Sequence, residues 1–120
     1  MRDYRKLKVF QKADQLAVEV YRATEMFQEG AGSELAVQMR RAALAVPANI
    51  VVGSARERLA DYGQSLNLSL DSLEELSYYL RFAFKMGLLP KDKAGELASN
   101  GKELARGLVG LIRSLKKLKD

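Results

Sequence analysis

Three carboxylates lie within one short stretch of the chain, Asp71, Glu74 and Glu75. On a helix, residues three or four apart share a face, so these side chains would be neighbours. Carboxylates arranged in this way can bind a divalent metal or serve as acid and base. The chain contains no His and no Cys, which excludes the Glu-x-x-His motifs of carboxylate di-metal bundles and all thiolate chemistry. We therefore interpret the cluster as solvated or salt-bridged, and we expect a protein that is not an enzyme and holds no metal or cofactor.

The basic residues are concentrated in the two terminal segments of the chain. Residues 1–22 hold six Lys or Arg against three acidic residues, and residues 101–120 hold six against two. Residues 23–100 hold eight basic and ten acidic residues, and the net charge is +5. This asymmetry favours an anionic partner, and the alternative is a solvated basic surface that aids solubility.

Hydrophobic periodicity predicts helices over about residues 7–28, 34–56, 59–86 and 91–118. The connections between them are short, so successive helices should be antiparallel neighbours. The prediction is an all-α fold, an up-down-up-down antiparallel four-helix bundle that forms a single domain over residues 1–120. The first and last helices are adjacent in such a bundle, which would bring the two basic segments side by side.

Local signals at the helix ends and along the last helix support this prediction. Ser33 is a plausible N-cap for the second helix, and Gly87 suits a left-handed position after the third. In the last helix, leucines recur with the seven-residue spacing that is typical of left-handed bundle packing. These leucines are Leu97, Leu104, Leu111 and Leu118, with Leu108 and Leu115 between them.

The second predicted helix is apolar on two opposite sides. One stripe should face the core of the bundle and consists of Leu35, Met39, Ala42, Val46, Ile50 and Gly53. The opposite side should be polar in a monomer, but it carries Val37, Leu44, Ala48 and Val51. The third helix adds Leu68, Tyr79 and Phe82 away from its own main stripe. We interpret these residues as the interface of a homo-oligomer, and the alternative is a thick core that buries them within one chain.

The stretch QMRRAALAVPANIVVGSAR, residues 38–56, carries a specific motif. It resembles the Q-x-R-R-A-A-x-S-x-P-x-N-I-A-E-G-x-x-R stretch of the four-helix-bundle family that includes the 23S rRNA intervening-sequence proteins, the S23 family. The motif residues that match are Gln38, Arg40, Arg41, Ala42, Ala43, Pro47, Asn49, Ile50, Gly53 and Arg56. The chain departs from the pattern at Ala45, where the family has Ser, and at Val51 and Val52, where the family has Ala and Glu.

The resemblance implies a small cytoplasmic bacterial bundle that assembles into a ring-like pentamer. A related branch of the family serves as accessory protein to the reverse transcriptase of diversity-generating retroelements. The missing Glu at Val52 implies that a motif arginine normally paired with it is freer or differently partnered here.

The function most consistent with these features is a non-enzymatic oligomeric scaffold that binds RNA or DNA through phosphate contacts with weak sequence specificity. No zinc finger, RNA-recognition motif or Gly-rich phosphate loop is present in the sequence. The candidate contacts are Arg5, Lys6, Lys8, Lys12, Arg40, Arg41, Arg56, Arg58, Arg113, Lys116, Lys117 and Lys119, with Arg2 beside them.

The alternative function is a protein-interaction adaptor, for example one accessory to a reverse transcriptase, without nucleic-acid binding of its own. We expect no membrane partner, because no uninterrupted apolar run approaches 18 residues and the start of the chain does not resemble a signal peptide. The last helix could be read as a membrane-surface helix, but its leucine seam fits bundle packing better.

Overall fold

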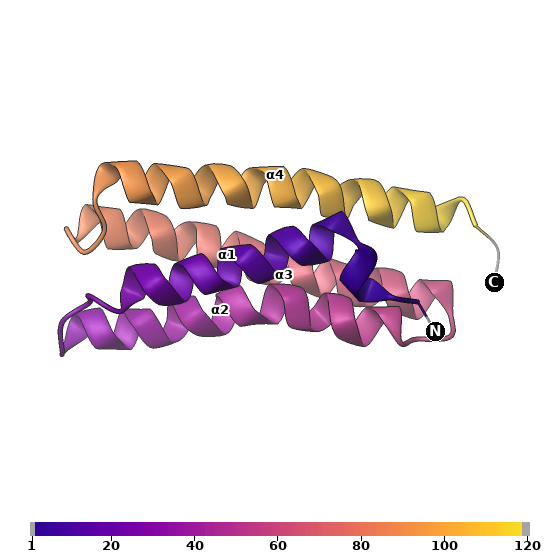
Figure 1. Cartoon of the computed structure of the whole chain (residues 1–120), viewed down its shortest axis with the longest axis horizontal. Coiled ribbons are helices and arrows are strands. Elements are labelled where there is room, and N and C mark those ends of the chain that lie inside the picture. Colours follow the sequence, from indigo (N-terminus) through magenta and orange to yellow (C-terminus); the bar gives the residue numbers. More distant parts are fainter. Residues whose placement is uncertain (1, 119–120) are drawn as a thin grey trace.

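The computed structural model describes residues 2–118 and shows an all-α bundle of helices packed side by side (Figure 1). The helices are α1 (Lys8–Thr24), α2 (Ala31–Ser54), α3 (Leu59–Lys85) and α4 (Lys91–Lys116), and a short 3-10 helix, η1 (Tyr4–Lys6), precedes them. Each helix packs against the next, and α1 also packs against α4. The bundle measures 48 × 21 × 20 Å. The predicted four-helix fold is confirmed.

The core runs along the centre of the bundle and takes one stripe from each helix. The largest side chains that are fully enclosed come from all four helices and include Val20, Met39, Val46, Ile50, Leu66, Leu76, Leu97 and Leu104. The predicted core stripe of α2 is buried as expected, except that Leu35 is only partly buried. Burial of these aliphatic side chains is the main stabilising term in a domain of this size.

Helices α2 and α3 approach each other closely because small residues lie at their contact. The Ser69 hydroxyl on α3 donates a hydrogen bond of 2.8 Å to the main-chain oxygen of Val46 on α2. Seven residues after Val46, Gly53 on α2 is buried against Tyr62 and Ser65 on α3. Gly53 therefore permits the close approach of α2 and α3.

The predicted N-cap of α2 is wrong. The helix begins at Ala31 rather than Glu34, and the residue in the capping position is Gly30, with φ at 89°. Ser33 lies inside the first turn, where its hydroxyl donates to the Gly30 oxygen (2.9 Å). Gly30 needs no side chain to begin the helix, because its left-handed φ turns the chain sharply between α1 and α2.

The predicted role of Gly87 is confirmed. Its φ is 74°, and it follows the last turn of α3. Its N–H donates to the Phe84 oxygen (3.0 Å), and the N–H of Leu88 donates to the Ala83 oxygen (2.9 Å). This pair of bonds forms a Schellman motif, which ends the helix and turns the chain toward α4.

The seven-residue seam predicted for α4 holds through most of the helix and fails at its end. Leu97, Leu104, Leu108 and Leu115 are buried. Leu111 is only partly buried, while Ile112 beside it is buried. Leu118 lies beyond the last turn and is 59% exposed. A helix with 3.6 residues per turn drifts away from a strict seven-residue repeat, which moves the buried stripe from Leu111 to Ile112.

Candidate interaction surfaces

The chain path gathers basic residues at one end of the bundle. The start of α1, the turn between α2 and α3, and the end of α4 all lie at this end (Figure 1). Residues 2–8, 55–61 and 113–117 hold nine Lys or Arg and three acidic residues. At the opposite end, residues 22–34 and 81–93 hold five basic and four acidic residues. We call the first group of segments the basic end and the second group the neutral end.

Most of the cations at the basic end are free of internal ion pairs. Arg5 pairs with Asp3 at 3.0 Å and lowers the pKa of that carboxyl below its ordinary value. Arg58 lies 4.0 Å from Asp61. Within residues 2–118, the remaining candidates at this end form no ion pair; they are Lys6, Lys8, Arg56, Arg113, Lys116 and Lys117. Their charges are available to an external anion. Lys119 lies outside the described residues.

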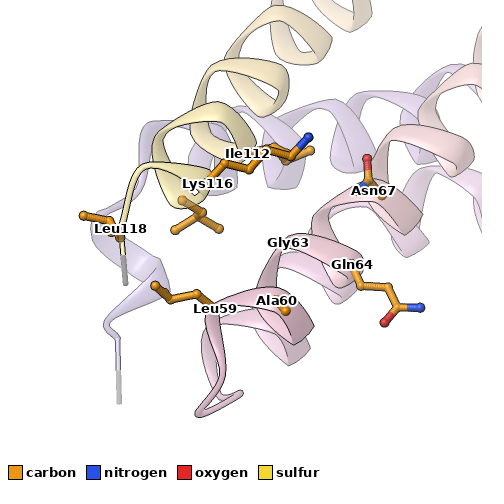
Figure 2. A pocket seen from close by; sticks show the side chains of 9 residues that line it. Leu59, Ala60, Gly63, Gln64, Asn67, Ile112, Lys116 and Leu118 are labelled. Carbon is orange, nitrogen blue, oxygen red and sulfur yellow. The ribbon is translucent and has the colours of Figure 1, made fainter. Parts of the chain in front are cut away.

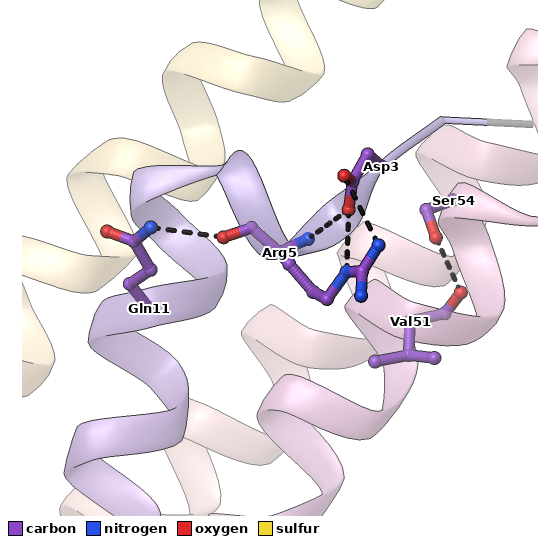
Figure 3. Close-up of polar contacts among 5 residues, drawn as sticks. All are labelled: Asp3, Arg5, Gln11, Val51 and Ser54. Atoms are coloured by element: carbon purple, nitrogen blue, oxygen red, sulfur yellow. Dashed lines mark hydrogen bonds and ion pairs between the residues drawn. The ribbon is translucent and has the colours of Figure 1, made fainter.

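Local polar contacts order the segment before α1 and the last turn of α2 (Figure 3). Asp3 accepts hydrogen bonds from the backbone N–H and the Nε of Arg5 (3.1 and 3.0 Å), and Gln11 donates to the Arg5 oxygen (3.0 Å). Ser54 donates to the Val51 oxygen (2.7 Å) in the last turn of α2. The bonds of Asp3 and Gln11 order η1 and join it to the start of α1, whereas the Ser54 bond lies within α2.

Arg2 spans from this segment to the end of α2. Its guanidinium donates to the main-chain oxygen of Arg56 just after α2 (2.6 Å) and to that of Ser54 (3.5 Å), one of the carbonyls left unsatisfied at the helix C-terminus. The same guanidinium stacks on the Tyr62 ring, 4.7 Å from its centroid. Burial raises the pKa of the Tyr62 hydroxyl. Arg2 therefore already has partners within the chain.

The two adjacent arginines of the motif have different surroundings. Arg40 reaches α1, where it donates to the Thr24 hydroxyl (2.8 Å) and to the Tyr21 oxygen (3.1 Å), and it lies over the Tyr21 ring at 4.6 Å. Arg41 is exposed on the side of α2 that faces away from the core and forms no ion pair within the described residues. Arg40 thus joins α2 to α1, and Arg41 is free to contact another molecule.

Lys12 is the candidate farthest along α1 from the basic end. It forms an ion pair with Glu103 on α4 and lowers the pKa of that carboxyl. Both side chains are about half exposed, so this pair contributes little to stability.

The remaining motif residues shape α2. Asn49 donates to the Ala45 oxygen one turn earlier (2.9 Å), so its bond lies within its own helix. Pro47 is buried inside α2, whereas Gln38 is exposed. Val52, at the position where the motif has Glu, is 45% exposed.

An exposed apolar surface covers the sides of α2 and α3 that face away from the core. Of the predicted interface residues, Val37, Leu44, Leu68 and Phe82 are 40–50% exposed, Ala48 is exposed, and Val51 and Tyr79 are partly buried. The sequence interpretation missed Val52 and Tyr78, which is 58% exposed. Tyr78 lies four residues before Phe82, and their rings are 6.2 Å apart. We call these nine residues the outer face.

Helix α2 is apolar on two sides, which bears on the prediction that the chain has no membrane partner. By length and composition, Gly32–Ser54 qualifies as a candidate membrane span among the described residues, with a mean hydropathy of 1.2. A core helix of a water-soluble bundle meets the same criterion, so this is weak evidence for a membrane segment. The helix is apolar because one side fills the core and the other side belongs to the outer face.

The carboxylates at Asp71, Glu74 and Glu75 are not arranged as a metal site. Within residues 2–118, no group of three or more acidic, His or Cys side chains is placed to hold a metal ion. Glu75 instead accepts a hydrogen bond from the Tyr79 hydroxyl (2.8 Å), and this bond raises the pKa of the tyrosine.

Two separate hollows lie between α3 and α4, one toward each end of the bundle. The hollow at the basic end has a volume of about 430 Å³, and side chains from both helices face it (Figure 2), among them Leu59, Asn67, Ile112 and Lys116. The hollow at the neutral end has a volume of about 350 Å³. Its apolar lining includes Leu80, Phe84, Ala94 and Ala98, and its cations are Arg81, Lys91 and Lys102. We call the two hollows together the α3–α4 groove.

Comparison with known proteins places these surfaces on a recognised fold. A family model described as 23S rRNA-intervening sequence protein matches residues 5–110. The fold is similar to that of a protein of unknown function from the S23 ribosomal protein family of Bacteroides thetaiotaomicron VPI-5482. The TM-score is 0.79 at 20% identity, over 88% of this chain and 98% of that chain, and at this identity the similarity shows the fold alone. No curated protein matches the chain.

Proposed function

The chain belongs to the 23S rRNA-intervening sequence protein family, and from this premise we propose that it is a non-enzymatic, homo-oligomeric scaffold that binds the phosphate backbone of nucleic acid. The observation that carries the proposal is the basic end, where nine cations from three separate segments converge against three carboxylates. A surface of this kind attracts nucleic acid through the release of counterions from the phosphates. It carries no motif for reading bases, so binding should be weakly sequence-specific.

Oligomerisation would strengthen this attraction. The outer face exposes large apolar side chains on two adjacent helices, which is typical of a protein–protein interface. A pentamer, the assembly that the family resemblance implies, would carry a net charge of about +25 from five copies of a +5 chain. Several basic ends held in one assembly would also bind a single nucleic acid multivalently.

The test is salt-dependent binding of a short RNA duplex, measured by fluorescence anisotropy. The variant Lys6→Gln/Lys117→Gln removes two unpaired cations from the basic end, one from each terminal segment. The matched control, Arg22→Gln/Lys85→Gln, removes two cations from the neutral end that likewise form no ion pair within residues 2–118. Each lost phosphate contact lowers the slope of log K against log salt by roughly 0.7–0.9. The first variant should therefore lose about 1.4–1.8 in slope, and the control should keep the wild-type slope.

Two results would contradict the proposal. Equal loss of affinity in both variants would mean that net charge alone attracts RNA and that the basic end has no special role. A wild-type protein that binds no RNA even at low salt would exclude nucleic-acid binding.

The outer face favours a second candidate function, the protein-interaction adaptor. In that case the exposed apolar side chains would contact a different protein, such as a reverse transcriptase, and the basic residues would serve solubility. A stable oligomer that ignores RNA would support the adaptor over the nucleic-acid scaffold.

A further inference from the structure

Helix α3 contributes to two different surfaces of the molecule. Phe82 belongs to the outer face, which α3 shares with α2. Its neighbour in the chain, Arg81, lines the hollow at the neutral end, which α3 shares with α4. One helix therefore separates an apolar surface that is shared with α2 from a hollowed surface that is shared with α4.

The charges that α3 and α4 contribute to these two surfaces are opposite in sign, whereas α2 adds the exposed cation of Arg41 to the outer side. The side of α3 that carries Leu68 and Phe82 also carries the exposed carboxylates of Asp71 and Glu75, three residues after Leu68 and seven residues before Phe82. Neither carboxylate forms an ion pair within residues 2–118.

The α3–α4 groove is basic and apolar at once. Arg81, Lys91 and Lys102 surround the hollow at the neutral end, and Lys116 lies at the other hollow. Within the described chain, none of these four cations forms an ion pair. Phe84 in the lining is 44% exposed, so part of the apolar lining faces solvent.

We propose that the α3–α4 groove of one copy receives the outer face of a second copy of this chain. Apolar side chains such as Leu68 and Phe82 would cover the apolar lining of the groove. The carboxylates of Asp71 and Glu75 would approach the unpaired cations at its edges. Charge complementarity of this kind fixes the register of an interface and disfavours other pairings. The inference rests on the homo-oligomer in the proposed function and identifies its two contacting surfaces.

The size of the bundle is sufficient for this contact. A stable interface buries about 800 Å² on each partner. A bundle that is 48 Å long and 21 Å wide presents a side of that order. Because the two surfaces differ, each copy offers its outer face to one neighbour and its groove to another. Such a heterologous contact forms a closed ring or an open filament.

A nucleic acid in the groove is less consistent with these observations. The lining of the neutral-end hollow is largely aliphatic, with Leu80, Ala94 and Ala98 between the cations. Apolar side chains of a helix fit such a lining, whereas a phosphate backbone would leave it exposed. Nucleic acid is therefore the competing occupant that the experiment must distinguish.

The experiment reverses the charges on each surface and measures the mass in solution by light scattering. Arg81→Glu/Lys102→Glu reverses the charge of the groove, and Asp71→Lys/Glu75→Lys reverses the charge of the outer face. All four side chains are exposed, so circular dichroism should show an intact bundle. Arg22→Glu/Arg106→Glu is the matched control, because these arginines are exposed but belong to neither surface.

We expect each reversed variant to fall to the monomer mass of 13.4 kDa, while the control keeps the wild-type mass. An equimolar mixture of the two reversed variants should associate to masses above the monomer, since the acidic groove of one now matches the basic outer face of the other. The two variants must alternate in such an assembly, so the mixture cannot close a ring of five copies. The variant that carries all four substitutions matches itself and should recover the wild-type mass.

Three results would overturn the inference, and they separate it from the proposed function. A groove variant that keeps the wild-type mass would mean that outer faces contact each other or another protein. A groove variant that keeps its mass but loses affinity for the RNA duplex would make the groove a nucleic-acid surface. A wild-type protein that is monomeric at every concentration would remove the oligomer on which both proposals depend.

Discussion

Gly53 on α2 lies so close to Ser65 on α3 that a β-carbon at Gly53 would stand 2.8 Å from the Ser65 β-carbon. The same added carbon would lie 3.0 Å from the Tyr62 ring and 3.3 Å from the Tyr62 main-chain oxygen. Two of these three neighbours are a main-chain atom and a β-carbon, which cannot move without shifting the helix. Only glycine permits the observed spacing of α2 and α3.

Gly53→Ala should therefore destabilise the bundle by about 1–3 kcal/mol, because the helices must separate to admit the methyl group. Gly110→Ala is the matched control, since a β-carbon there meets nothing within 4 Å. That substitution should stabilise the fold by up to about 1 kcal/mol, because alanine is the better helix former. Urea denaturation measures the free energy of unfolding of both variants. Equal changes in the two would contradict the interpretation that Gly53 lies at a close contact between α2 and α3.

Arg40 and Arg41 offer a matched pair of substitutions on adjacent residues. Arg40→Ala should lower the free energy of unfolding by about 2 kcal/mol, because it removes two hydrogen bonds from a charged donor that join α2 to α1. Arg41→Ala should change it by less than about 0.5 kcal/mol, as is usual for an exposed side chain without partners in the chain. A chemical denaturation series would show the difference. Similar values for both would mean that the contact of Arg40 with Thr24 and Tyr21 contributes little.

Leu68→Glu should dissociate the proposed oligomer, because it places a charge at the centre of the outer face. Light scattering should then give the monomer mass. Met26→Glu is the control: Met26 is 71% exposed in the turn after α1 and does not belong to the outer face. An oligomer that survives Leu68→Glu would show that this surface is not the interface.

Tyr62 should make the stability of the bundle depend on pH in the alkaline range. Burial raises the pKa of Tyr62 above its ordinary value of 10.0, so the folded state favours the neutral phenol. The unfolded chain therefore loses this proton at a lower pH than the folded chain, and the free energy of unfolding falls as pH rises above about 10. In the Tyr62→Phe variant the free energy of unfolding should fall less between pH 8 and pH 11, because residue 62 then has no hydroxyl to ionise. Urea denaturation at several pH values measures the free energy of unfolding of both proteins. The same dependence on pH in the wild type and the variant would contradict the prediction.

Much of the fold follows from local patterns, and the deviations have local causes. Helical periodicity and short connections were enough to predict the bundle, and Gly87 marked the end of α3 because few other residues adopt its φ. The start of α2 was misplaced because Gly30 turns the chain without any capping side chain. Leu118 was expected in the core seam, yet it is exposed because α4 ends at Lys116 and Leu118 lies beyond its last turn.

The interaction surfaces were less predictable, because they depend on distances between helices. The sequence shows basic segments at both termini, but the contribution of Arg56 and Arg58 to the same end follows only from the chain path. Nothing in the spacing of Arg40 and Arg41 indicates that one contacts α1 and the other faces solvent. Tyr78 was missed because its place on the outer face depends on how α3 is rotated against α2.

The arrangement of the helix ends has a practical consequence for labelling. Any tag or fused domain attached next to α1 or α4 would stand directly over the basic end and would compete with a large polyanion for that space. The turn between α1 and α2 lies at the opposite end of the bundle, about 48 Å away along its long axis. Because the chain has no cysteine of its own, a single cysteine placed in that turn would carry a fluorophore that reports on assembly and leaves the basic end uncovered.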